Sequence, residues 1–232
     1  GTAEPVLLGQ GQVTSANALF DEHYYLSHNP DIAQAVATGA FSSGWQHYVE
    51  FGQFEGRDPS AYFDEATYLR ANPDVGHAVQ AGTLTSGFMH FTEYGQKEGR
   101  AGVPYFNETY YLANNPDVAQ AVASGAFASG FEHFMLFGAA EGRSPIPSFS
   151  ASYYVAHNPD IASVIQGTAF RSAYEHFILF WQYEDRTYSP DFNETIYLQK
   201  NPDIAQAVAS HAFQTGLQHY LLYGQYEGRI SV

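Results

Sequence analysis

The stretch HNPDIAQAV, residues 28–36, indicates the fold because it occurs five times in the chain in slightly different forms. The Asn-Pro-Asp triplets are spaced by 43 residues at every step. A constant period of this length is typical of proteins built from stacked structural repeats. We divide the chain into a linker or lead-in segment, residues 1–19, and five repeats, residues 20–62, 63–105, 106–148, 149–191 and 192–232. The triplets begin at Asn29, Asn72, Asn115, Asn158 and Asn201.

The first half of each repeat predicts two short helices. In repeat 1, Asp21 is a suitable N-cap for a helix through Tyr25, and Glu22 complements the positive end of its dipole. Proline disfavours helical backbone in the residue before it, so this helix should end before Asn29. Asn29 is then a suitable N-cap for a second helix with Pro30 in the first position.

The second half of each repeat predicts a third helix. Ser43 precedes a helical pattern, and Gln46 follows three residues later, an arrangement typical of a capping box. The helix carries an aromatic run and should end at Gly52. A period near 43 also suits the blades of a β-propeller, but Ala-rich segments and a proline at a helix start disfavour strands. The sequence therefore predicts an all-α fold, an α-solenoid of five tandem repeats with about three short helices each.

The composition narrows the choice of partners. Nine Lys and Arg stand against 24 Asp and Glu, a net charge of −15. Such a chain repels phosphate backbones and anionic lipid, so we expect no nucleic acid partner. No run of 18 apolar residues occurs, so we expect no membrane insertion. The chain has no Cys, which excludes disulfides and thiolate metal sites.

One histidine recurs at the same position of every repeat. Such a set could bind zinc, copper or haem. However, no second His or carboxylate recurs at i+4 to complete a site, and aromatic residues flank each imidazole. We therefore expect a structural hydrogen bond rather than a metal or cofactor. The residues are His47, His90, His133, His176 and His219.

One arginine also recurs, and it accounts for five of the nine basic residues. We expect its guanidinium to pair with the Asn-Pro-Asp carboxylate of its own or the next repeat, so that the pair ties adjacent repeats together. The alternative is a row of arginines that grips an anionic ligand, which the negative surroundings disfavour. The arginines are Arg57, Arg100, Arg143, Arg186 and Arg229, and the aspartates are Asp31, Asp74, Asp117, Asp160 and Asp203.

Repeat 4 departs most from the others. Trp181 replaces the glycine that ends the third helix, and Tyr183 and Tyr188 lie close to it in sequence. An aromatic cluster at a helix end could stack on sugar rings or anchor a protein partner. The alternative is that repeat 4 packs differently to fix a bend. Recognised catalytic motifs are missing from the sequence, so we do not expect an enzyme.

The joint pattern F-D-E-x-Y-Y-L-x-x-N-P-D-V-A-x-A-V and S-G-x-x-H-F-x-x-F-G-x-x-E-G-R resembles a repeat of large secreted bacterial proteins, some of which carry RTX calcium-binding repeats. It also resembles segments beside bacterial glycosyltransferase and polysaccharide-processing domains. The resemblance covers residues 20–229 and implies a secreted or cell-surface location. The calcium-binding nonapeptide is absent from the sequence, so calcium is not carried over.

Three functional interpretations follow. The first is a noncatalytic module that binds extracellular polysaccharide or a surface protein. The second is a structural spacer or a surface array in which copies associate end to end. The third, a metal or haem carrier using the recurring His and Tyr residues, is the least favoured.

Overall fold

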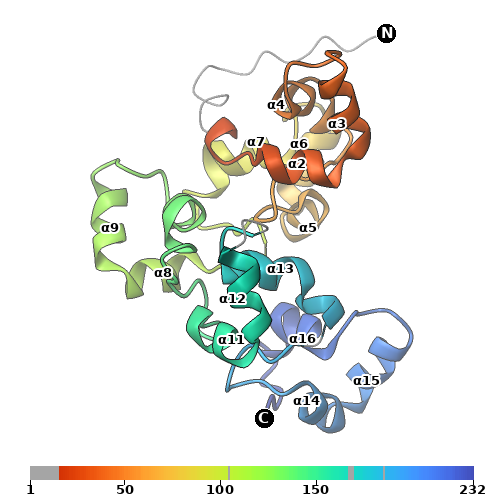
Figure 1. The fold of residues 1–232 in the computed structure, drawn as a ribbon, viewed down its shortest axis with the longest axis vertical. Helices are drawn as coiled ribbons and strands as arrows, with labels where there is room; N and C mark the ends of the chain where they lie inside the picture. Colours follow the sequence, from red (N-terminus) through yellow and green to blue (C-terminus); the bar gives the residue numbers. More distant parts are fainter. Residues whose placement is uncertain (1–15, 104, 167–169, 185) are drawn as a thin grey trace. The chain divides into compact units, whose positions relative to one another are not determined.

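The computed structural model describes residues 16–103, 105–166, 170–184 and 186–232, and these residues are helical with short connections (Figure 1). In this part of the chain the β-structure is limited to an isolated bridge between Ser60 and Phe63. The prediction of an all-α fold with about three short helices per repeat is confirmed. The same bonds return every 43 residues or so, which confirms the periodicity.

Each repeat contains two α-helices followed by a third helical segment. The first helices are α2 (Glu22–His28), α5 (Glu65–Ala71), α8 (Glu108–Asn114), α11 (Ala151–His157) and α14 (Glu194–Lys200). The second helices are α3 (Pro30–Ala37), α6 (Pro73–Gln80), α9 (Pro116–Ala123), α12 (Pro159–Gln166) and α15 (Pro202–Ala209). The third begin as α4 (Gly44–His47), α7 (Gly87–His90), α10 (Gly130–His133), α13 (Ala173–Glu184) and α16 (Gly216–His219).

The first helix of every repeat begins as predicted. The Asp21 side chain accepts a hydrogen bond from the Tyr24 backbone N–H at 3.0 Å, which satisfies one of the unpaired donors of the first turn. The equivalent residues of the other repeats make the same cap. They are Asp64, Asn107, Ser150 and Asn193.

The predicted cap of the second helix is wrong in its chemistry. Pro30 occupies the start of α3 as expected, but Asn29 makes no side-chain cap bond. Its Nδ2 instead donates to the Tyr25 carbonyl at 2.7 Å, and its Oδ1 accepts from Arg57. The residue preferences of helix N-caps do not predict the bond from Arg57 to Asn29, because Arg57 lies 28 residues further along the chain.

The third helix is capped twice. Ser43 Oγ accepts from the Gln46 N–H at 3.0 Å, as the sequence predicts. Gln46 Oε1 does not close a capping box on Ser43 but accepts from the N–H of Ser42 at 2.7 Å. The second cap was not predicted: Glu22 accepts from the N–H groups of Gly44 and Trp45, at 2.5 and 3.0 Å. Glu22 therefore bonds the first helix to the third.

In four repeats the third helix widens into a π-helical turn. The segments are η1 (Tyr48–Gly52), η2 (Phe91–Gly95), η3 (Phe134–Gly138) and η4 (Tyr220–Gly224). Their glycine is required by a close approach: a Cβ at Gly52 would lie 2.1 Å from the Tyr25 hydroxyl oxygen. Repeat 4 has Trp181 at this position, and its α13 is α-helical throughout Ala173–Glu184.

The described residues form two compact units. One comprises the described residues up to Val103 together with Gln120–Glu132, and the other comprises the described residues within 104–119 and 133–232. Inside each unit the core is aromatic. In the first, for example, Phe63 packs on Tyr68 and Phe91 with ring centroids 5.0 and 5.3 Å apart. Ala16 and Leu19, at the start of the described part, are also buried. Within the described residues, no helix has both the length and the apolar character needed to cross a membrane.

Candidate functional site

The recurring histidine and the first-helix tyrosine form one hydrogen bond in every repeat. Tyr25 Oη lies 2.8 Å from His47 Nδ1, and the four other repeats repeat the contact at 2.7 to 2.8 Å. All five tyrosines are at most 1% exposed. In three repeats His Nε2 faces the glutamate of the closing turn at 3.9 to 4.0 Å, which favours a proton on Nε2 and leaves Nδ1 to accept from the phenol. The prediction of a structural histidine is consistent with this bond.

The recurring arginine completes the group. Arg57 donates from both terminal nitrogens to Asp31, at 2.8 and 3.0 Å, and from Nε to Glu55 at 2.7 Å. Its Nη1 also donates to Asn29 Oδ1 at 2.8 Å. We call these six side chains the repeat cluster. In repeat 1 it consists of Tyr25, Asn29, Asp31, His47, Glu55 and Arg57.

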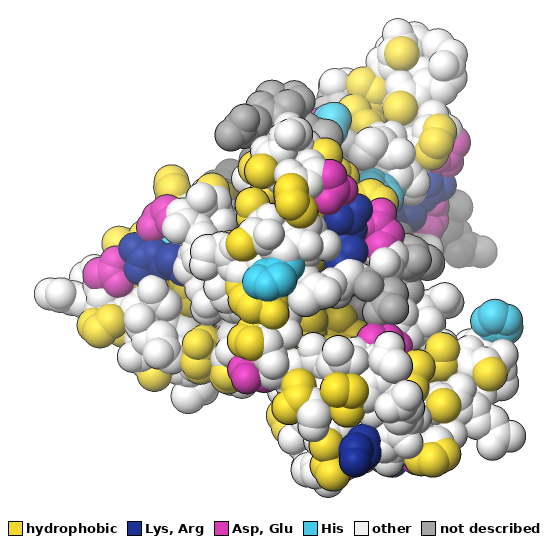
Figure 2. Space-filling view, turned by 60° about the horizontal axis from the view of Figure 1, so that its bottom comes forward, with side chains coloured by type: hydrophobic (Ala, Val, Ile, Leu, Met, Phe, Trp, Pro, Cys, Tyr) yellow, Lys and Arg dark blue, Asp and Glu magenta, His cyan; other side chains and the backbone are white. Residues whose placement is uncertain are grey.

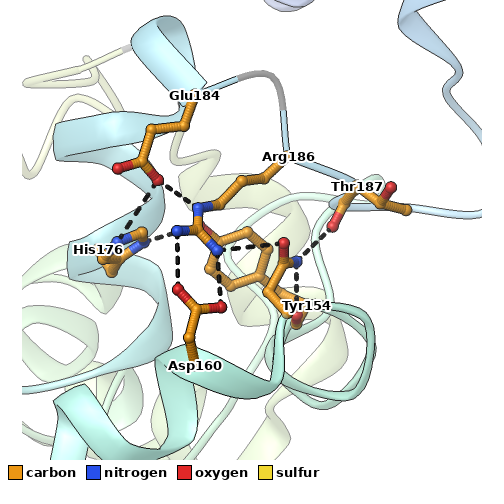
Figure 3. Close-up of polar contacts among 7 residues, drawn as sticks. Tyr154, Asp160, His176, Glu184, Arg186 and Thr187 are labelled. Atoms are coloured by element: carbon orange, nitrogen blue, oxygen red, sulfur yellow. Dashed lines mark hydrogen bonds and ion pairs between the residues drawn. The ribbon is translucent and has the colours of Figure 1, made fainter.

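Figure 3 shows the repeat cluster of repeat 4, with Arg186 between Glu184 and Asp160. The Arg186 terminal nitrogens donate to the two Asp160 oxygens at 2.8 and 2.9 Å. Asn158 donates to the carbonyls of Tyr154 and Thr187, both at 2.8 Å. The cluster therefore joins the first helix, the second helix and the closing turn of a single repeat.

The expected arginine–aspartate pair is present, but its predicted role between repeats is wrong. Each arginine pairs with the aspartate 26 residues before it, in its own repeat. Other side chains make bonds between repeats: Ser86 Oγ donates to Gln53 Oε1 at 3.2 Å, Ser129 Oγ donates to Gln96 Oε1 at 2.8 Å, and Asp58 accepts from the Glu65 N–H at 2.9 Å. The arginine therefore closes each repeat, and in repeats 1 and 2 a glutamine helps to join the repeat to the next one.

Burial and pairing fix the charge states in the cluster. Burial raises the pKa of every cluster tyrosine, to about 12 for Tyr197, so the phenols stay neutral. Burial also lowers the pKa of the five histidines, which keeps their imidazoles neutral at pH 7. Hydrogen bonds from Arg100 and Arg143 lower the pKa of Asp74 and Asp117 to about 2. In each repeat cluster, a hydrogen bond between a neutral tyrosine and a neutral histidine thus lies beside a charged arginine–aspartate pair.

Removing one arginine tests the cluster as a structural element. Arg100→Met should lower the melting temperature, because Asp74, Glu98 and Asn72 lose their shared donor. Ordinary surface substitutions change stability by at most about 0.5 kcal/mol, and we expect a clearly larger loss here. Arg70→Met in the same repeat is the matched control, since Arg70 makes a long 3.4 Å contact with Thr67. Equal effects of the two changes would contradict the structural role.

The lowered histidine pKa values predict a loss of stability in mild acid. The unfolded chain binds protons at its histidines as the pH falls below about 6.5, whereas the folded clusters resist protonation. The stabilising contribution is therefore complete above pH 6.5 and is lost as the pH falls through the lowered folded values.

The buried carboxyl of Asp58 contributes to stability with the opposite pH dependence, because burial raises its pKa to about 7. Its contribution is complete below about pH 4 and is lost as the pH rises through 7. The measurement is therefore a difference in melting temperature between the native chain and His133→Gln from pH 7 to pH 5, in which the effect of Asp58 cancels. The difference in melting temperature should become smaller as the pH falls, because only the native chain loses the contribution of His133. His77→Gln is the control. A difference that becomes larger in acid would contradict the lowered pKa of the cluster histidines.

The described residues contain no group of three or more His, Cys, Asp or Glu side chains arranged to hold a metal ion. The cluster histidines already use Nδ1 for the tyrosine hydroxyl. The side chains of the repeat cluster therefore form a hydrogen-bond network.

An aromatic side chain lies on the outside of each cluster. Phe51 packs beside His47 with ring centroids 5.8 Å apart, and Phe41 meets both rings edge-on at 5.0 and 5.9 Å. Despite these contacts, Phe51 remains 49% exposed. Repeat 5 builds the same group from Phe213, His219 and Tyr223. We call the equivalent residues the surface aromatics: Phe51, Tyr94, Phe137, Phe180 and Tyr223.

The aromatic cluster predicted for repeat 4 is only partly described. Trp181 and Tyr183 lie in α13, but their side chains fall outside the described part of the structure. Tyr188 is 1% exposed and stacks on Phe177 with ring centroids 5.2 Å apart. Tyr188 is therefore a core residue here, and recognition by this cluster stays a prediction.

No known protein family, curated protein or solved structure significantly matches the chain. Its own repeats are therefore the basis for comparison. Sequence reasoning missed the surface aromatics, although an aromatic residue at a fixed position in all five repeats was the available indication. It also missed the bridging role of Gln53 and Gln96; a glutamine recurs at this position in repeats 1, 2, 4 and 5 and is replaced by Ala139 in repeat 3.

Proposed function

We propose that the chain is a noncatalytic repeat module of a secreted or cell-surface bacterial protein, and that it binds neutral glycans through the surface aromatics. One observation carries this proposal. The aromatic ring at the same position is about half exposed in four repeats, at 49% for Phe51, 47% for Tyr94, 51% for Phe137 and 51% for Tyr223. A single exposed aromatic would need no explanation, but a periodic set does.

The backing of these rings supports the proposal. Phe51 and Tyr223 are held against the imidazole of their repeat cluster, so little side-chain freedom is lost when a ligand binds. A flat apolar ring matches the C–H face of a pyranose, and Tyr223 adds a hydroxyl at its edge.

Charge sets the ligand class. Acidic residues outnumber basic ones by 24 to 9, and each recurring arginine is already paired with carboxylates. On the face drawn in Figure 2, most of the Lys and Arg side chains lie beside Asp and Glu side chains. Polyanionic glycans would be repelled by such a surface, so neutral polysaccharides are the favoured class. The sequence resemblance to repeats found beside polysaccharide-processing domains agrees with this choice.

The test is binding to immobilised neutral and anionic bacterial polysaccharides. We expect retention on at least one neutral glycan, and we expect the combined change of Phe51, Tyr94, Phe137 and Tyr223 to Ala to weaken it at least about tenfold, since aromatic contacts dominate binding hot spots. Ile230→Ala is the control, because Ile230 is 56% exposed and lies outside the set. Unchanged binding by the fourfold variant would refute the proposal.

A structural spacer is the second candidate. The specific observation in its favour is the pair of buried Gln–Ser bonds that join successive repeats in the first compact unit. A spacer would retain no glycan in the assay above, and Gln96→Ala would loosen the array without affecting a ligand.

A further inference from the structure

The junction between successive repeats follows a pattern that the first compact unit shows twice. Tyr48 of repeat 1 meets Phe88 of repeat 2 edge-on, with ring centroids 5.6 Å apart, and Ser86 Oγ donates to Gln53 Oε1 at 3.2 Å. One repeat later, Phe91 meets Phe131 at 4.9 Å and Ser129 Oγ donates to Gln96 Oε1 at 2.8 Å. All eight side chains are at most 4% exposed. A junction is thus an aromatic edge contact combined with a buried Gln–Ser bond.

Repeat 5 carries the glutamine half of this junction. Tyr220 and Gln225 occupy the positions of Tyr48 and Gln53, and both are partly exposed where Tyr48 and Gln53 are buried. Gln225 Nε2 donates to the Leu221 carbonyl at 2.7 Å, as Gln53 Nε2 donates to the Val49 carbonyl at 2.6 Å. This bond fixes the amide, so the Gln225 Oε1 atom is held as it is in the two formed junctions.

Repeat 1 carries the serine half. Ser43 and Trp45 occupy the positions of Ser86 and Phe88, and they too are partly exposed where their equivalents are buried. Ser43 Oγ accepts from the Gln46 N–H at 3.0 Å, and Ser86 Oγ accepts from the Met89 N–H at 3.2 Å while it donates to Gln53. The Ser43 hydroxyl can therefore donate in the same way.

We propose that copies of this chain associate head to tail, with Tyr220 and Gln225 of one copy packed on Trp45 and Ser43 of the next. The contact reproduces the repeat-to-repeat junction, with Ser43 Oγ donating to Gln225 Oε1 and the Trp45 ring against Tyr220. Because the two halves differ, the interface is heterologous and extends into an open series of copies rather than a closed pair. This inference is independent of glycan binding, since the surface aromatics are not part of it.

Two single variants test the interface. Ser43→Asp keeps a good N-cap, because Asp caps helices as well as Ser, but places a carboxylate against Gln225 Oε1. Gln225→Lys keeps a donor for the Leu221 carbonyl but directs positive charge at the start of α4, where the helix dipole is also positive. Melting temperatures close to that of the native chain show that both variants fold.

Sedimentation velocity over a concentration series is the measurement. The native chain should show a mass that rises with concentration beyond the dimer, and each variant should associate at least tenfold more weakly. An equimolar mixture of the two variants should associate at least to the dimer, because the intact half of one variant pairs with the intact half of the other. A native chain that stays monomeric, or a mixture that does not form dimers, would overturn the proposal.

Discussion

Gly95→Ala should destabilise the protein by about 2–4 kcal/mol, the sum of overpacking a buried site and losing a hydrogen bond. A Cβ at this position would lie 2.2 Å from the Tyr68 hydroxyl oxygen and 3.4 Å from the Phe91 ring. Tyr68 is 1% exposed and hydrogen-bonded to His90, so it cannot move aside without breaking that bond. Chemical denaturation of the variant measures the loss.

A glycine-to-alanine substitution at Gly76, also in repeat 2, should change the stability in the opposite direction. Gly76 lies inside α6 (Pro73–Gln80), and an added Cβ would meet nothing closer than the Leu69 carbonyl at 3.4 Å. The other four repeats have alanine at this position. Gly76→Ala should therefore stabilise the protein by about 0.5–1 kcal/mol through a better helix propensity. If Gly95→Ala did not destabilise the protein, the result would contradict the close packing of Tyr68 against the π-helical turn.

Glu65→Ala is the second change with a large expected effect, a loss of about 2–3 kcal/mol from removing charged hydrogen bonds to buried donors. Glu65 is 5% exposed and accepts from the N–H groups of Gly87 and Phe88 at 2.6 and 3.0 Å. Burial raises the pKa of this carboxyl, while the two N–H bonds lower it. Its removal leaves the start of α7 with two buried unpaired donors.

Repeat 4 suggests how the loss can be reduced. There the glutamate is replaced by Ala151 and the facing glycine by Ala173. In repeat 2 a Cβ at Gly87 would lie 3.0 Å from Glu65 Oε1, so Gly87→Ala alone should cost about 1–2 kcal/mol through overpacking. The double variant should lose less than the two single losses combined, by about 1 kcal/mol, as coupled neighbours do. Strict additivity in this cycle would show that the two positions are not coupled.

Local rules predicted the helix starts because their partners are close in sequence. Asp21 and Ser43 cap helices through N–H groups three residues away, and the constant period repeats these starts through the chain. The arginine–aspartate pair was also predictable as chemistry, since five of nine basic residues occupy one position. Its placement inside one repeat was not, because spacing alone does not distinguish the aspartate 26 residues earlier from that of the next repeat.

The parts that sequence reasoning missed depend on the π-helical turn. No propensity rule predicts such a turn, and its glycine looks like an ordinary helix end. Only the packed tyrosine shows why Gly52 is needed. Gln53 has its role for the same reason: the widened turn leaves the Val49 carbonyl to the Gln53 side chain, which then reaches Ser86 of the next repeat.

The central claim is that one Tyr–His hydrogen bond closes each of five helical repeats, and ¹⁵N NMR of the imidazole rings tests it most directly. We expect His47, His90, His133, His176 and His219 to share one state at pH 7, neutral with the proton on Nε2, and each to show a coupling from Nδ1 to a slowly exchanging tyrosine hydroxyl proton. Protonated Nδ1 atoms, or hydroxyl protons lost at once to solvent in these five residues, would contradict the account.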